Sequence, residues 1–161
     1  MRIALDGCDG TGKTTISEKL ANKFGCNIAR LTYGGDRSFK AYVNLMMCDN
    51  VVHDRTFLSE IIYPKYFGRE SHLDSNIIPD LFELIKLFDV KLFILTAKPE
   101  TILERIGKRG DEFIDDSNKF IQINADYVTT AMENNFIIID TTNKTIDEIV
   151  EEIGGYLNDC R

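Results

Sequence analysis

The sequence contains no apolar run that approaches the ~18 consecutive residues of a membrane-spanning helix. It does not open with the positively charged, then apolar segment that is typical of a signal peptide. Its four cysteines form no C-x-x-C pair and no spacing characteristic of a metal site, which indicates a reducing compartment. We therefore expect a cytoplasmic protein that does not enter membranes.

Basic residues are also fewer than acidic ones. The chain has 19 Lys and Arg against 26 Asp and Glu, a formal net charge of −7. Proteins that bind long nucleic acids depend on clustered Lys and Arg, so this charge argues against such a substrate, although a local basic cleft stays compatible with it. The 161 residues, 43% hydrophobic and 28% charged, indicate one globular domain over residues 1–161.

The most informative segment is GCDGTGKT at residues 7–14, which matches G-x-x-x-x-G-K-S/T in full. In this motif the glycines let backbone N–H groups converge on phosphate oxygens, and the following helix adds partial positive charge. Lys13 reaches the outer phosphates and the Thr14 hydroxyl can hold Mg²⁺. A chance match in a glycine-rich turn is the alternative. The residues expected to hold the nucleotide are Gly7, Gly10, Thr11, Gly12, Lys13, Thr14 and Thr15.

Strand-like and helix-like runs alternate along the whole chain. The expected strands are residues 1–6, 26–32, 50–54, 90–95 and 136–140. The expected helices are residues 15–24, 38–47, 56–67, 76–88, 99–106, 118–134 and 145–157. This pattern predicts an α/β fold with a parallel sheet covered by helices on both faces. Ligands in such sheets bind at the carboxyl ends of the strands, where the phosphate loop lies.

A second polar cluster, Asp54 and Arg55, ends the apolar run of the third strand. An acidic residue there can hold Mg²⁺ through water, and Arg55 suits an anionic oxygen. The alternative is that Asp54 caps the next helix while Arg55 is a surface charge. His53 points to the other face of the strand, where we expect a structural role.

A third cluster of charge lies at residues 105–112. Arg105 and Arg109 are four residues apart and so share a helix face. Gly107 and Gly110 would let residues 105–117 move as a lid over the nucleotide, with the cations facing the transferring phosphoryl group. The alternative is a solvated face paired with neighbouring acidic residues.

Together the three segments resemble the thymidylate kinases and the related deoxynucleoside kinases of the P-loop superfamily. LDGCDGTGKTT at residues 5–15 is similar to that family's E-G-x-D-G-x-G-K-S/T-T loop. DRT at residues 54–56, followed by Ser59, resembles its D-R-Y/F/H/S motif. Residues 95–110 resemble its L-x-x-x-P-E…R-I-x-x-R-G segment. The resemblance implies a three-layer P-loop kinase fold with a five-stranded parallel sheet of order 2-3-1-4-5 and a short lid.

The resemblance also implies roles for single residues. Lys13 and the loop amides bind the phosphates of ATP, and Thr14 holds Mg²⁺ with support from Asp54. Arg55 holds the phosphate of the acceptor, and Asp9 faces the acceptor sugar. The residues implied to clamp phosphates or to lie near the adenine are Arg105, Arg109, Thr141, Asn143 and Lys144.

The chain departs from the family after the second strand. Only Gly34 and Gly35 match the R-x-P-G-G pattern there, because Leu31 and Tyr33 replace the Arg and the Pro. Arg37 can supply the missing charge. Aromatic side chains near the helix with which relatives read the base can stack on a nucleobase, with core packing as the alternative. These side chains are Phe39, Tyr42, Tyr63, Tyr66 and Phe67.

The sequence lacks a carboxylate at the position where related kinases use one to activate the hydroxyl of a nucleoside acceptor. A sugar hydroxyl that attacks a phosphate benefits from a carboxylate that accepts its proton. Similar deoxynucleoside kinases keep a Glu at the end of the second strand and read the base with a Gln. Here residues 31–36 contain no Glu, and the only Gln is Gln122. A monophosphate is already ionised and needs cations such as Arg55. We therefore expect ATP-dependent phosphoryl transfer to a deoxynucleoside monophosphate.

Other activities remain open at this point. The runner-up is a deoxynucleoside kinase that phosphorylates the 5′-hydroxyl with Asp36 as a displaced base, and a DNA- or RNA-directed kinase is more remote. A GTP-dependent switch does not fit, because the sequence lacks N-K-x-D. The resemblance leaves a homodimer open through an apolar patch, with burial in the monomer as the alternative. The patch residues are Met46, Met47, Phe57 and Ile61.

Overall fold

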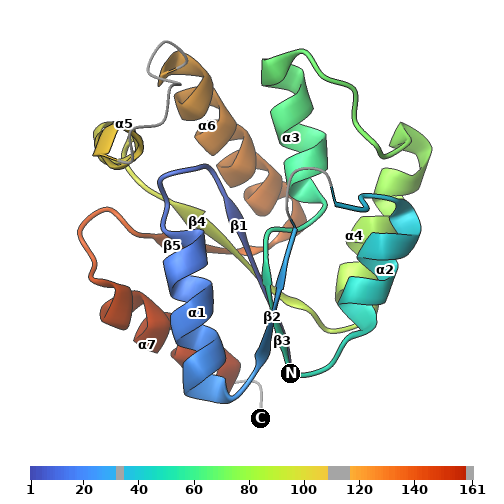
Figure 1. Ribbon diagram of the computed structural model, residues 1–161, viewed down its shortest axis with the longest axis horizontal. Helices are drawn as coiled ribbons and strands as arrows, with labels where there is room; N and C mark the ends of the chain where they lie inside the picture. Colours follow the sequence, from blue (N-terminus) through green and yellow to red (C-terminus); the bar gives the residue numbers. More distant parts are fainter. Residues whose placement is uncertain (32–34, 109–116, 159–161) are drawn as a thin grey trace.

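The computed structural model describes residues 1–31, 35–108 and 117–158, and shows a five-stranded parallel sheet of order β2-β3-β1-β4-β5 (Figure 1). The strands are β1 (Arg2–Gly7), β2 (Asn27–Arg30), β3 (Val51–Asp54), β4 (Lys91–Thr96) and β5 (Ile137–Asp140). The helices are α1 (Lys13–Phe24), α2 (Phe39–Met47), α3 (Leu58–Phe67), α4 (Ile78–Leu87), α5 (Pro99–Lys108), α6 (Ser117–Asn134) and α7 (Ile146–Asn158), with a 3₁₀ turn η1 (Ser75–Ile77). The predicted fold class and strand order are confirmed.

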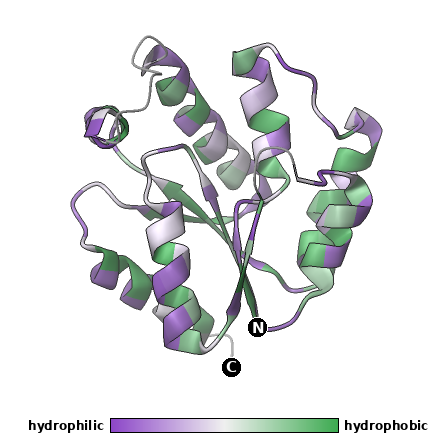
Figure 2. Ribbon diagram, in the orientation of Figure 1, coloured by the Kyte–Doolittle hydropathy of each residue, from purple (hydrophilic) through white to green (hydrophobic). Residues whose placement is uncertain are grey.

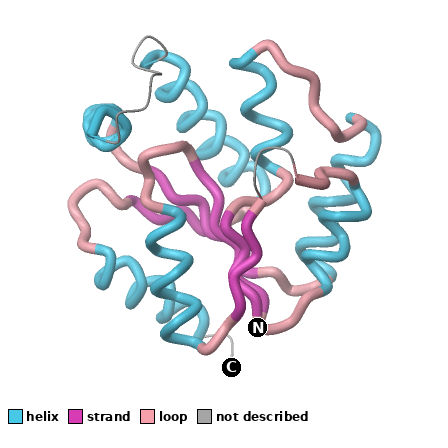
Figure 3. Tube along the Cα trace, in the orientation of Figure 1, coloured by secondary structure: helices cyan, strands magenta, loops and turns pink. Residues whose placement is uncertain are grey.

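The central strand β1 is hydrogen-bonded on both sides. It pairs with β3, where Leu5 lies opposite Asp54, and with β4, where Gly7 lies opposite Leu95. Its apolar residues are buried from Ile3 to Leu5, as expected for a parallel strand covered on both faces. The loops that follow β1 and β3 therefore emerge next to each other at one edge of the sheet (Figure 3).

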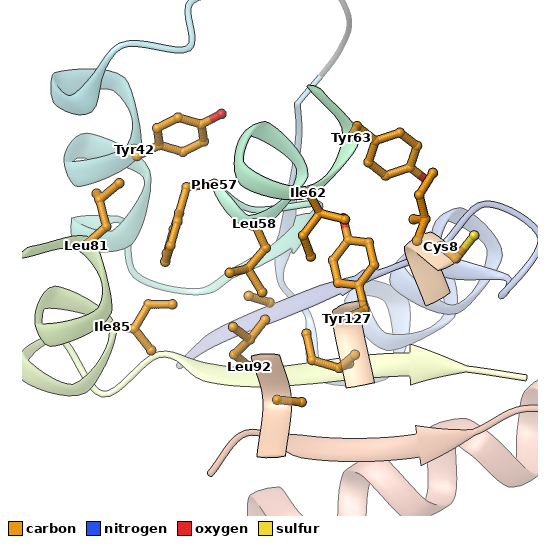
Figure 4. Packing of buried hydrophobic residues seen from close by; sticks show 14 of the residues in the cluster. Cys8, Tyr42, Phe57, Leu58, Ile62, Tyr63, Leu81, Ile85, Leu92 and Tyr127 are labelled. Carbon is orange, nitrogen blue, oxygen red and sulfur yellow. The ribbon is translucent and has the colours of Figure 1, made fainter. Parts of the chain in front are cut away.

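Two apolar clusters hold the helices on the two faces. On one face, side chains of α2, α3, α4 and α6 pack around Ala4 and Leu92, and Figure 4 shows Phe57, Leu58 and Tyr127 between these elements. On the other face, α1 and α7 pack against Ile3 and Leu5. Green apolar sides of the helices turn toward the sheet while purple polar sides face outward (Figure 2). The sheet is thus the middle of three layers.

Element boundaries differ from expectation at a few ends. β2 is shorter than predicted, and α4 begins at Ile78 after η1 because Pro79 suits the first turn of a helix. α5 continues to Lys108, and the remainder of the expected lid, residues 109–116, lies outside the described residues. None of the described helices is long and apolar enough to cross a membrane.

Burial in the monomer accounts for half of the expected dimer patch. Met46 and Phe57 belong to the core, with exposed fractions of 6% and 0%. Met47 is exposed, and Ile61 is partly buried against the core cluster. These four side chains therefore do not form one exposed surface.

Candidate active site

The phosphate loop joins β1 to α1 in a conformation that requires glycine. Gly7 has a φ of 141°, and a Cβ there would lie 2.2 Å from the carbonyl oxygen of Leu95. Gly10 has a φ of 82°, and its Cβ would lie 2.9 Å from the carbonyl oxygen of Ile102. The loop therefore lies directly against β4 and α5, and its backbone turns tightly enough for N–H groups to converge.

The start of α1 is suited to an anion. Its N-cap residue, Gly12, has no side chain that could occupy the N–H groups of the first turn. These N–H groups and the positive end of the helix dipole favour a phosphate. Thr14 and Thr15, in the same turn, are exposed and can reach a ligand.

The ammonium of Lys13 lies inside the loop. Its Nζ donates to the carbonyl oxygen of Cys8 at 2.8 Å, and the Thr11 hydroxyl donates to the same oxygen at 2.7 Å. The side chain is only 5% exposed. Burial lowers the pKa of Lys13, and the nearby Arg55 lowers it further. A phosphate placed here would relieve this unfavourable burial of positive charge.

Thr14 and Asp54 fit the ligand chemistry of Mg²⁺. Asp54 lies opposite Leu5 in the register of the sheet, so its carboxylate is on the face that α1 covers. Its Oδ2 lies 3.6 Å from Nε of Arg30. In the described part of the chain no three His, Cys, Asp or Glu side chains form a metal cluster. Mg²⁺ commonly takes one or two protein oxygens and completes its shell with waters and substrate phosphates.

Two buried titratable side chains, one in β3 and one in the phosphate loop, stay neutral. His53 is buried on the face opposite to Asp54, and burial lowers its pKa to about 4. Cys8 is fully buried, and its thiol donates to the carbonyl oxygen of Phe120 at 3.3 Å. Burial raises the pKa of Cys8 to about 12. Burial therefore keeps both side chains uncharged at neutral pH.

Asp9 forms a charged cluster with two cations. The Arg55 guanidinium donates to Asp9 Oδ1, and Lys13 Nζ lies 3.7 Å from the same oxygen. The guanidinium carbon lies 5.4 Å from the centre of the Tyr63 ring, and the Tyr63 hydroxyl accepts from the Asp9 N–H at 3.0 Å. Burial raises the pKa of Asp9, but Lys13 and Arg55 outweigh it and bring the pKa to about 2. Asp9 is therefore a firmly paired anion and a weak base.

A cavity of about 670 Å³ opens beside this cluster. Three arginines, Arg37, Arg55 and Arg69, line it together with the carboxylates of Asp9 and Glu60. The aromatic part of its wall consists of Tyr42, Tyr63, Phe67 and Phe120. The cavity thus combines positive charge with flat apolar surfaces, which are the two features that a nucleotide needs.

Glu60 anchors Arg37 in the wall of the cavity. The Arg37 guanidinium donates to Glu60 Oε1, and the side chains are 10% and 3% exposed. His72, from the loop after α3, approaches Glu60 Oε2 with its N–H at 3.3 Å and its Nδ1 at 3.0 Å. Burial raises the pKa of Glu60, but the hydrogen bonds from His72 and Arg37 outweigh it and lower the pKa.

Some residues named from sequence lie away from the cavity. Phe39 and Tyr66 are partly buried against the core cluster rather than in the cavity lining. Asp36 is exposed and accepts from the Ser38 N–H at 2.9 Å, at the start of α2. Tyr33 and Gly34 lie outside the described residues.

Arg105 links the phosphate loop to the loop after β5. Its NH1 donates to the carbonyl oxygen of Gly10 at 3.2 Å and to the Thr141 hydroxyl at 3.0 Å. Its NH2 donates to the Thr141 carbonyl oxygen at 2.9 Å. Asn143 is exposed two residues later in the same loop. Arg109 and Gly110 lie outside the described residues.

The sequence assigned no role to Asp6, Glu60 or Arg69. Asp6 is fully buried at the end of β1, next to the phosphate loop. Glu60 and Arg69 line the cavity from α3 and the loop that follows it. The position of Asp6 at a strand end was a usable signal, whereas Glu60 and Arg69 match no motif.

The chain is similar to several known proteins over most of its length. The thymidylate kinase family model matches residues 37–153. A Methanocaldococcus jannaschii protein named "Probable thymidylate kinase" is 30% identical over 187 residues, covering 98% of this chain and 95% of that protein. A Pyrococcus abyssi protein named "Putative adenylate kinase" is 36% identical over 161 residues, covering 98% and 84%. The crystal structure of Bacillus subtilis YorR matches with a TM-score of 0.82 and 25% identity, covering 98% and 96%. The chain belongs to the thymidylate kinase family of P-loop nucleotide and nucleoside kinases.

Proposed function

We propose that this protein transfers the γ-phosphoryl group of ATP to a deoxynucleoside monophosphate held in the cavity beside the phosphate loop. The observation that carries the proposal is the lining of this cavity, where Arg37, Arg55 and Arg69 meet aromatic side chains. Arginine matches a phosphate with its fork of N–H donors, and aromatic rings match the face of a base.

A monophosphate suits the cavity better than a nucleoside, because the two carboxylates that line the cavity are already paired with cations or hydrogen-bond donors. Asp9 is paired with Lys13 and Arg55, and its pKa is about 2. Glu60 is bonded to Arg37 and His72, and the pKa of Glu60 is lowered as well. A proton acceptor works best when its pKa is near the working pH, so neither carboxylate is suited to activate a hydroxyl. A phosphate brings its own ionised oxygen.

The donor nucleotide would bind on the other side of Asp9. The loop N–H groups and the start of α1 would hold its phosphates, with Lys13 at the outer ones. Mg²⁺ supplies positive charge that offsets the phosphates when bound, and Thr14 and Asp54 are the residues that would hold it. Lys13 and Arg55 would then approach the transferring group from two directions, and most of the catalysis would come from positioning and charge. Arg105 and Arg109 of the lid and Asn143 near the adenine complete the proposed set.

The names of the relatives leave the base of the acceptor open. Similar proteins are named as thymidylate kinases and as adenylate kinases. The YorR crystal contains phosphorylated GDP. A panel of thymine, cytosine, adenine and guanine monophosphates therefore determines which base the acceptor carries.

A coupled assay of ATP consumption over these nucleosides and their 5′-monophosphates tests the proposal. We expect consumption with at least one monophosphate and none with nucleosides. Consumption with nucleosides alone would establish the runner-up, a deoxynucleoside kinase. An additional arm offers oligonucleotides with free 5′-hydroxyls, and phosphate transfer only to these would identify a DNA- or RNA-directed kinase instead.

A variant pair ties the activity to the cavity. Arg55→Met should raise the acceptor KM and lower kcat, because the cation that faces both Asp9 and the acceptor is lost. The matched control, Lys86→Met, removes a cation from an exposed ion pair with Glu83 on α4 and should leave both constants unchanged. Equal behaviour of the two variants would contradict the proposed site.

A further inference from the structure

Asp6 is a fully buried carboxylate at the acidic first position of the phosphate-loop pattern, and the proposed function gives it no role. Its Oδ1 accepts from the Gly7 N–H at 2.9 Å, the Tyr127 hydroxyl at 2.9 Å and the Ser59 hydroxyl at 3.2 Å. Its Oδ2 accepts from the Thr56 N–H at 2.8 Å and the Thr56 hydroxyl at 2.6 Å. One anion therefore joins β1, the segment after β3, and helix α6.

The residue next to this anchor has an unusual backbone. Arg55 has a φ of 82°, in the left-handed region that residues other than glycine adopt rarely and at a cost in energy. Its own N–H donates to the Leu5 carbonyl oxygen at 2.9 Å, and the next N–H, of Thr56, donates to Asp6. The strained residue is thus fixed on both sides, by consecutive residues of β1.

The left-handed backbone conformation of Arg55 sets the direction in which its side chain leaves the main chain. From its position after β3 the side chain reaches Asp9 and lines the acceptor cavity. A relaxed backbone at Arg55 would turn the side chain in another direction, because φ sets the course of the Cα–Cβ bond relative to the strand. The link from Asp6 to Thr56 therefore bears directly on the geometry of the acceptor site.

We propose that Asp6 is the positioning residue of the acceptor site: through Thr56 it holds Arg55 in the left-handed conformation that brings the guanidinium to Asp9 and the acceptor. The effect of Asp6 on the acceptor rests on the proposed function of Arg55. Its effect on the conformation of Arg55 does not, and the two can be measured separately.

Asp6→Asn is the sharpest perturbation, because the amide cannot satisfy every donor. If its NH₂ faces Thr56, the Thr56 N–H loses its acceptor. If its NH₂ lies on the other side, the Gly7 N–H loses its acceptor, whereas the hydroxyls of Ser59 and Tyr127 can turn and accept. The second orientation would disturb the phosphate loop, so binding of ATP is measured alongside.

The first readout does not depend on activity. The Nε–Hε resonance of Arg55 in an ¹⁵N–¹H correlation spectrum is assigned by its loss in Arg55→Lys. We expect it to move or broaden in Asp6→Asn and in Thr56→Val, which deletes the hydroxyl bonded to Asp6. The control Tyr127→Phe removes a different donor to Asp6, and should lower the Tm while leaving the Arg55 signal in place. A folded Asp6→Asn with an unmoved Arg55 signal overturns the proposal; if Asp6→Asn does not fold, Thr56→Val decides in the same way.

The second readout is kinetic and uses the acceptor that the nucleotide panel identifies. We expect the acceptor KM of Asp6→Asn to rise by about tenfold, as for loss of one buried hydrogen bond, with the ATP dissociation constant within about twofold of wild type. Equal weakening of ATP and acceptor would mean a general structural role and would also overturn the proposal. If wild type accepts no monophosphate, the proposed function fails while the Arg55 spectrum still tests Asp6.

Discussion

Arg37 and Glu60 form an ion pair in the wall of the cavity beside the phosphate loop, with the two side chains 10% and 3% exposed. The pair couples two properties that can be measured independently. Glu60 restrains a cation that lines the cavity, and the same contact ties the segment before α2 to helix α3.

Loss of the Glu60 carboxylate should therefore affect both stability and acceptor binding. We expect Glu60→Gln to lower the free energy of unfolding by about 2 kcal/mol, because the Arg37 charge loses a buried partner. The acceptor KM should change in the same variant. Urea denaturation and steady-state kinetics measure the two effects. The control is Glu83→Gln, at an exposed ion pair with Lys86, which should lower the free energy of unfolding by about 0.5 kcal/mol or less. Equal losses in the two variants would show that the buried pair with Arg37 stabilises the fold no more than a surface pair.

Removal of the Lys13 ammonium should abolish most of the phosphoryl transfer. The ammonium lies within the phosphate loop, where it would meet the charge that develops on the transferring group. We expect Lys13→Ala to lower kcat by about 10²–10³, the usual loss for one group that stabilises transition-state charge. Lys23→Ala removes an exposed cation from the far end of α1 and should change kcat little. Unaltered turnover in Lys13→Ala would exclude the proposed mechanism.

The pKa of Asp9 predicts an acid-sensitive contribution to stability. The folded value is about 2 against an ordinary 3.8, so the carboxylate stabilises the fold fully above pH 4 and loses this effect as the pH falls toward 2. The free energy of unfolding of wild type should exceed that of Asp9→Asn by about 2 kcal/mol at pH 6. The difference should fall to about half of that at pH 3. Denaturant titrations of both proteins at a series of pH values test this. A difference that stays constant down to pH 3 would show that Asp9 is not held by Lys13 and Arg55.

Cysteine labelling should separate the buried thiol from the exposed one. Cys8 is fully buried with a pKa of about 12, whereas Cys48 is exposed. Because the thiolate is the reactive species, iodoacetamide at neutral pH should modify Cys48 and spare Cys8 in the folded protein. Peptide mass spectrometry identifies the labelled sites, and denaturation should make Cys8 reactive. Early labelling of Cys8 in the folded protein would contradict the packing of the loop.

Arg105 should matter for binding of the donor nucleotide. Its guanidinium joins the Gly10 carbonyl to Thr141, so Arg105→Ala disconnects the phosphate loop from the loop after β5. We expect the KM for ATP to rise by about tenfold, the scale of one hydrogen bond to a charged group. Glu104→Gln, at an exposed position of the same helix, should leave this constant unchanged.

The elements and the parallel α/β class could be predicted because their signals are local, whereas the strand order came from the family resemblance. Alternation of apolar strands with amphipathic helices determines the layers, and the phosphate loop identifies the first strand and helix. Errors are confined to element ends. α4 begins later than predicted because the residues before it form a 3₁₀ turn, Ser75–Ile77. Hydrophobic spacing does not distinguish a 3₁₀ turn from the first turn of an α-helix.

The site was predicted in part. Asp9 and Arg55 lie in motifs and line the cavity, and so do side chains that were named from sequence without a motif: Arg37, Tyr42, Tyr63 and Phe67. Phe39 was also named, but on α2 it is Tyr42 that faces the cavity while Phe39 packs on the core. Which side of a helix meets a neighbour depends on how the helices pack, and this information is not local. Asp6 and Tyr127 meet across 121 residues of sequence for the same reason.

The position of β1 at the centre of the sheet determines which parts of the molecule can open locally without global unfolding. A strand hydrogen-bonded on both sides and covered by two apolar clusters should exchange its amide hydrogens only when the whole protein unfolds. The phosphate loop and Asp6 are attached to this strand, whereas α2 and α3 contribute part of the cavity wall. Local opening should therefore begin at α2 and α3. Under the proposed function, the acceptor could then enter and leave while the phosphate loop keeps its structure.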